Sequence, residues 1–77
     1  MTIAELRAGD RARILALDAP PDLEIKLREV GFCEGDCVEL IARGPVDGQP
    51  LAVRLNRRLI AMRLSEAHAI KVERLRD

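Results

Sequence analysis

The segment REVGFCEGDCVEL, residues 28–40, decides the fold, because a helix ends and a sheet begins within it. Gly31 predicts the left-handed residue that follows the last turn of a helix, and Phe32 predicts the apolar residue that packs back onto that turn. Gly35 marks a second turn. Val38 and Leu40 then begin the alternation of apolar and polar residues that is typical of a half-buried strand.

The residues before this segment predict one α-helix. Pro20 and Pro21 suit a helix start, because proline fits the first helical position. Leu23, Leu27 and Val30 fall at i, i+4 and i+7, so one face of the helix is apolar and the other positions are mostly charged. We therefore predict a helix over about residues 21–30, with Gly31 and Gly35 as structural turn residues.

The rest of the chain predicts short strands joined by tight turns. Strands are expected over residues 11–17, 36–43, 51–55, 58–63 and 69–75. In the second strand, Val38, Leu40 and Ala42 would share one face. The dipeptide Asp47-Gly48 predicts the tight turn of a hairpin. Residues 65–68 predict a single helical turn capped by Ser65.

A flat sheet of five short strands would leave two open edges, and closure into a barrel removes them. We therefore predict a mainly β fold, a small SH3-like β-barrel of about five strands with one inserted α-helix at about residues 21–30. The 77 residues form a single domain, residues 1–77. A chain of this size has a thin core, with little room for a deep pocket of the ~300 Å³ or more that small-molecule sites need.

The amino-acid composition excludes several function classes. The formal net charge is zero, and the chain holds one Phe, no Trp and no Tyr. Binding of single-stranded nucleic acid by base stacking needs aromatic platforms, so no nucleic-acid partner is expected. No apolar run approaches the ~20 residues that span a bilayer, and no signal peptide begins the chain. We therefore expect a cytoplasmic protein that is not itself inserted in a membrane.

The two cysteines of the chain, Cys33 and Cys37, lie in the quoted segment with three residues between them. A reducing cytoplasm makes a structural disulfide unlikely to persist. Their spacing suits zinc, but a structural zinc site has four ligands and His68 is the chain's single histidine. One hypothesis is thus that Cys33, Cys37 and His68 bind Fe²⁺ or Zn²⁺. The alternative is that the two cysteines only fill space as small apolar side chains. No cofactor is required.

Charge differs between the two halves of the chain. Residues 1–42 carry five basic and nine acidic side chains, and residues 43–77 carry eight basic and four acidic ones. Arg54, Arg57, Arg58 and Arg63 lie on or beside two adjacent predicted strands. They are candidates for partner binding. The alternative is that these charges protect a sheet edge from aggregation.

An ordered set of residues, mostly glycines, prolines and aliphatic residues, runs through the chain: Leu6, Gly9, Ile14, Leu27, Val30, Gly31, Phe32, Gly35, Val38, Leu40, Gly44, Pro45, Pro50, Ile60, Ala61, Met62, Arg63, Glu66, Ala67, Ile70 and Val72. With this set at these spacings, the chain as a whole resembles the FeoA family of bacterial ferrous-iron uptake. Val30 and Phe32 replace leucines of the family pattern. Neither cysteine belongs to that pattern.

The resemblance implies an accessory role rather than catalysis. FeoA-like proteins resemble adaptors of the membrane GTPase-transporter FeoB, and their motifs imply no enzymatic activity. We expect an adaptor that supports ferrous iron transport by contact with FeoB. The contact surface is either the helix with Cys33 or the edge formed by the four arginines. The alternative function is a stand-alone transition-metal-binding or metal-sensing barrel that uses Cys33 and Cys37.

Overall fold

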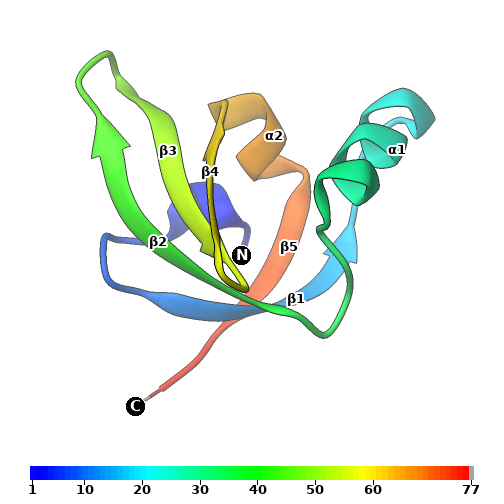
Figure 1. Ribbon diagram of the computed structural model, residues 1–77, viewed down its shortest axis with the longest axis horizontal. Helices are drawn as coiled ribbons and strands as arrows, with labels where there is room; N and C mark the ends of the chain where they lie inside the picture. Colours follow the sequence, from blue (N-terminus) through cyan, green and yellow to red (C-terminus); the bar gives the residue numbers. More distant parts are fainter. Residues whose placement is uncertain (77) are drawn as a thin grey trace.

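The sheet and helices that the sequence predicts are present in the computed structural model, which describes residues 1–76 (Figure 1). Asp77, the last residue of the predicted domain, lies outside the described residues. The elements in chain order are the 3₁₀ turn η1 (Ile3–Glu5), β1 (Arg11–Leu17), α1 (Pro21–Val30), β2 (Cys37–Gly44), β3 (Gly48–Leu55), β4 (Arg58–Met62), α2 (Leu64–His68) and β5 (Ile70–Arg74).

All five strands form one antiparallel sheet in the order β4-β3-β2-β1-β5. Figure 1 shows β1 passing below the β2–β3 hairpin and the sheet bent around the core, with α2 above it and α1 standing to one side. This arrangement confirms the predicted mainly β, SH3-like barrel with one helix inserted after the first strand. The helix has the predicted bounds, Pro21–Val30.

The barrel is not closed by hydrogen bonds between its two edge strands. The sheet ends at β4 on one side and at β5 on the other. Part of the β5 edge is covered by the start of the chain, since the Val72 N–H donates to the Met1 carbonyl at 3.0 Å and Thr2 forms a bridge with Lys71. Because α2 lies between β4 and β5 (Figure 1), the expectation that closure removes both edges is wrong for β4.

The core consists of aliphatic side chains from every strand, together with one aromatic ring. No polar or charged side chain of residues 1–76 is buried. Burial of these apolar groups is the main source of stability in a domain of this size. The buried residues are Ile3, Leu6, Ala12, Ile14, Leu27, Phe32, Val38, Leu40, Leu51, Val53, Leu55, Met62, Ala67, Ala69, Ile70 and Val72.

The β2–β3 hairpin turns at Asp47-Gly48, as predicted. Both residues have positive φ, 53° and 76°, and the Gln49 N–H donates to the Val46 carbonyl at 3.0 Å. Two consecutive positive φ angles define the type I′ turn, whose twist matches that of the flanking strands.

An irregularity in β2 changes which residues face the core. The register of β2 with β3 shifts between Leu40 and Ala42, so Ala42 is exposed and the prediction that it shares a face with Val38 and Leu40 is wrong. A bulge inserts one residue into a strand and thereby reverses the alternation beyond it. After the shift, the Arg43 Nη2 donates to the carbonyls of Ala4 at 2.5 Å and of Leu6 at 2.9 Å. Arg43 therefore ties the far end of the hairpin to the start of the chain.

The short helix α2 begins one residue earlier than predicted. It starts at Leu64, and its N-cap is Arg63, whose backbone N–H donates to Glu66 Oε1 at 2.7 Å. The prediction that Ser65 caps this turn is therefore wrong. Glu66 supplies the bond, three residues after the cap, as the glutamate of a capping box does.

Candidate partner-binding groove

The end of α1 is fixed by a glycine turn and by an arginine from the sheet. The Gly31 N–H donates to the Arg28 carbonyl and the Phe32 N–H to the Leu27 carbonyl, each at 3.1 Å, which is the Schellman pattern of a helix C-terminus. Gly31 has a φ of +123°. The guanidinium of Arg58, at the start of β4, donates to the Val30 carbonyl and occupies the space where a Cβ on Gly31 would lie.

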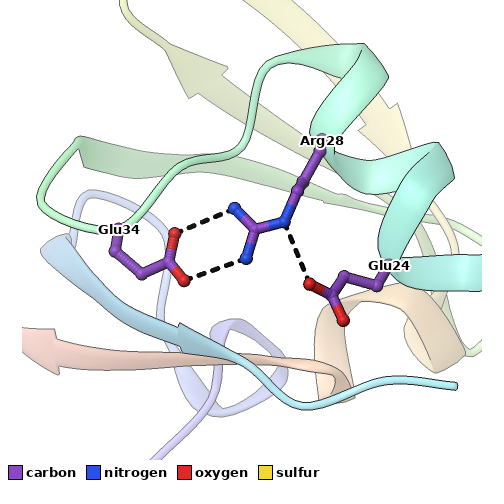
Figure 2. Close-up of polar contacts among 3 residues, drawn as sticks. All are labelled: Glu24, Arg28 and Glu34. Carbon is purple, nitrogen blue, oxygen red and sulfur yellow. Dashed lines mark hydrogen bonds and ion pairs between the residues drawn. The ribbon is translucent and has the colours of Figure 1, made fainter. Parts of the chain in front are cut away.

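Three charged side chains tie the same helix end to the following turn (Figure 2). The Arg28 Nη1 and Nη2 donate to the two carboxylate oxygens of Glu34, each at 3.0 Å, and its Nε donates to Glu24 at 3.0 Å. The hydrogen bonds from Arg28 lower the pKa of Glu34 to about 2, and the same contacts raise the pKa of Arg28. The turn that carries Cys33 and leads to Cys37 is thus held against α1.

These two attachments leave a groove between α1 and β4, which we call the α1–β4 groove. Its volume is about 380 Å³. Leu27 and Val30 form the α1 side, Phe32 lies at the helix end, and Ile60 and Met62 line the β4 side. The sequence predicted little room for a deep pocket, and the groove of this volume is open to solvent rather than enclosed.

Charged side chains lie at the rim of the α1–β4 groove. Lys26 of α1, Arg63 after β4 and Glu66 of α2 line it. The Lys26 Nζ lies 3.6 Å from Glu66 Oε2, so an ion pair joins the helices across the groove. The second oxygen of Glu66 accepts the Arg63 backbone N–H. Both carboxylate oxygens of Glu66 are therefore engaged, and neither pairs with the guanidinium of Arg63. That guanidinium adds positive charge to this rim.

The four arginines predicted to bind a partner do not form one surface. Arg63 lines the α1–β4 groove, and Arg58 reaches across to the helix end. Arg57 is exposed in the β3–β4 turn. Arg54 lies elsewhere: its Nη1 is 3.6 Å from Glu39 of β2, and it lines a separate depression of about 200 Å³ beside Cys37.

The predicted metal-ligand candidates do not form one site of three ligands. Cys33 and Cys37 are exposed free thiols, one in the turn after α1 and one at the start of β2. His68 is the last residue of α2. Within residues 1–76, no group of three or more His, Cys, Asp and Glu side chains is arranged to hold a metal ion.

Several residues that line the α1–β4 groove carry no signal for it in the sequence. Lys26 and Glu66 are forty positions apart, and neither belongs to a motif that predicts an ion pair between them. The sequence predicts Phe32 only as the apolar residue of the helix end and Ile60 only as a strand residue. The strand order is what indicates a groove here, because it places β4 at a sheet edge that an inserted helix can flank.

The fold and the groove define a class of protein, a small SH3-like β-barrel with a mostly apolar groove that has charged residues in its lining. Comparison of sequences identifies the family within that class. The FeoA domain family matches residues 1–74, and the chain belongs to the FeoA family, which is associated with ferrous iron transport and is not a known enzyme family. The comparison with curated proteins found no match. None of the helices in residues 1–76 is long and apolar enough to cross a membrane.

Solved structures of FeoA proteins resemble this chain over most of its length. FeoA of Stenotrophomonas maltophilia, complexed with zinc and described as a procaryotic SH3 domain protein, is 36% identical, with a TM-score of 0.83 and 95% of this chain and 89% of that chain covered. FeoA of Chlorobium tepidum is 34% identical, with a TM-score of 0.88 and coverages of 99% and 71%.

Two further structures extend the comparison. Iron(II) transport protein A of Clostridium thermocellum is 33% identical, with a TM-score of 0.90; 97% of this chain is covered, but only 46% of that one. A manganese-dependent transcriptional repressor is 20% identical, with a TM-score of 0.86 and coverages of 97% and 41%. At that identity the repressor shows a shared fold alone.

Proposed function

We propose that this protein is a cytoplasmic adaptor of ferrous iron uptake and acts by binding the membrane GTPase-transporter FeoB. The observation that carries the proposal is the α1–β4 groove, a solvent-open depression with a mostly apolar lining on a barrel of the FeoA family. Apolar surface that is rimmed by polar residues is typical of a protein-protein contact. The relative from Stenotrophomonas maltophilia is described as a candidate activating factor of bacterial ferrous iron transport, which supports a role beside a transporter.

The chemistry of the groove favours binding over catalysis. Val30 and Ile60 are partly exposed and supply apolar contact area, and the buried Leu27, Phe32 and Met62 lie behind them. None of the five residues is a nucleophile or a general base. Two of the charged side chains at the rim, Lys26 and Glu66, pair with each other. Such a surface provides a central apolar contact and a polar border, which is the usual anatomy of an interface between proteins.

The proposal is tested by direct binding and by transport. We expect the purified chain to bind the cytosolic region of FeoB from the same organism in calorimetry, and Ile60→Asp to weaken that binding at least tenfold. Ile25→Asp is the matched control, because Ile25 lies on α1 but is 59% exposed and does not line the groove. Circular dichroism would verify that both variants keep the wild-type fold.

Transport supplies the second readout. A strain that lacks this chain should take up radioactive ferrous iron more slowly than its parent, and the wild-type chain should restore the rate. The proposed function fails if the deletion leaves the rate unchanged, or if the wild-type chain shows no binding to the FeoB region.

A further inference from the structure

The edge strand β4 carries backbone groups that the protein leaves without partners. In the part of the chain that the structure describes, backbone hydrogen bonds of β4 run to β3 alone. The N–H groups that follow the strand, those of Arg63 and Leu64, bond to the side chains of Glu66 and Gln49. The free edge therefore ends where α2 begins.

The free edge of β4 borders the α1–β4 groove along most of its length. Ile60, Ala61 and Met62 line the groove, and α1 faces them from the other side. Leu59, which alternates with Ile60, is 64% exposed on the outer face of the strand. An unpaired row of N–H and C=O groups beside an apolar groove combines the two features by which a sheet edge binds an extended peptide.

We propose that β4 binds an extended segment of a partner protein as a sixth strand, with acidic residues at the ends of that segment and apolar residues at alternate positions. This proposal rests on the proposed function, because it specifies how the adaptor would contact its partner. Strand addition satisfies the free backbone groups of β4. Every second side chain of the added strand points toward the groove, where Val30 and Ile60 are partly exposed, because side chains alternate along a strand.

The charges around β4 select an acidic segment. Arg57 and Arg58 precede the central residues of the strand, and Arg63 follows them. No ion pair involving any of these three guanidinium groups occurs within residues 1–76. Opposite charges across a strand pair stabilise it and like charges destabilise it. An added strand with carboxylates at both ends therefore fits this edge.

The same charges disfavour a second copy of this chain as the occupant. Two copies that pair in antiparallel fashion through the same edge of β4 must be centred on a residue, because the backbone groups of only every second residue point to that edge. A pair centred on Ile60 places Arg57 of each copy opposite Arg63 of the other. This register opposes arginine to arginine twice, so it disfavours self-pairing.

A display experiment with two matched peptide libraries tests the proposal. Both libraries hold eight-residue peptides with random apolar residues at alternate positions, and they differ only in carrying glutamate or lysine at the two ends. We expect binders from the glutamate library and none from the lysine library. The recovered peptide should protect β4 amides from hydrogen exchange, and Arg57→Glu and Arg63→Glu should each weaken it about fivefold.

Arg76→Glu is the control, because it makes the same charge change after β5, the strand at the opposite end of the sheet from β4, and should leave affinity unchanged. The proposal is overturned if neither library yields binders, if both yield them equally, or if the recovered peptide leaves β4 amides unprotected. Failure of the adaptor role is distinguishable. In that case the peptide binds β4, but the FeoB region does not bind the chain.

Discussion

Gly31 meets two independent constraints at one residue. Its φ of +123° lies where side chains other than hydrogen are strained, and the Arg58 guanidinium occupies the position of a Cβ. Gly35 meets the first constraint alone, because its φ is +91° and nothing lies within 4 Å of a built Cβ. Substitutions at the two glycines therefore distinguish the cost of backbone strain from the cost of a steric clash.

We predict that Gly35→Ala lowers the free energy of unfolding by about 1–2 kcal/mol, the cost of a left-handed conformation for a residue with a side chain. Gly31→Ala should cost at least ~1 kcal/mol more, since Arg58 must also move. Urea denaturation of both variants measures the difference. Equal losses of unfolding free energy in the two variants would show that the Arg58 side chain moves aside at no cost. In an Arg58→Ala background, the additional loss caused by Gly31→Ala should disappear.

At the scale of the elements, α1 is attached mainly through its C-terminal end. Leu27 is the single buried residue of this ten-residue helix, while Leu23 and Val30 pack partly against the core. The Schellman turn, the Arg58 bond to Val30 and the Arg28–Glu34 ion pair all act at the same end. This attachment sets the distance between α1 and β4, and hence the width of the groove.

The Arg28–Glu34 contact makes a specific prediction for pH. Because the pKa of Glu34 in the folded chain, about 2, is below its ordinary value of 4.5, the contact stabilises the fold above about pH 4.5 and the contribution declines as pH falls toward 2. A carbon-detected NMR titration should give a Glu34 midpoint near 2, and Arg28→Gln should return it toward 4.5. Glu29→Gln is the control and should not change it. A wild-type midpoint near 4.5 would contradict the ion pair in solution.

Over the whole molecule, ionisable groups lie at the surface and the interior is aliphatic. The cysteines and the histidine lie on different elements, and no three potential ligands converge within residues 1–76. Zinc sites take three or four protein ligands in a fixed geometry. The described residues therefore present no preformed metal site of three or more ligands.

We predict that the reduced chain binds neither Zn²⁺ nor anaerobic Fe²⁺ more tightly than about 1 μM in calorimetry. A chelator should leave the thermal midpoint unchanged, because the core needs no ion to fold. Cys33→Ala and Cys37→Ala should match wild type in both measurements. Stoichiometric binding that either substitution abolishes would support the alternative of a metal-binding barrel.

The sequence by itself determined the features that local chemistry fixes. The glycine that follows the apolar helical face ends α1 at Val30. The dipeptide Asp47-Gly48 forms the tight turn with two positive φ angles that its composition favours. The alternation of aliphatic residues predicts the strands. The sequence could not place the bulge in β2 that exposes Ala42, or the start of α2, because both depend on bonds to residues outside the local pattern.

Only the tertiary structure decided which distant residues meet. Arg58 bonds a carbonyl 28 residues away, and Arg43 bonds one 39 residues away. The α1–β4 groove and the free edge of β4 arise from the strand order and from α2 lying between the two edges. Periodicity specifies which face of an element is apolar, whereas the neighbour of that face is set by the packing of the whole chain.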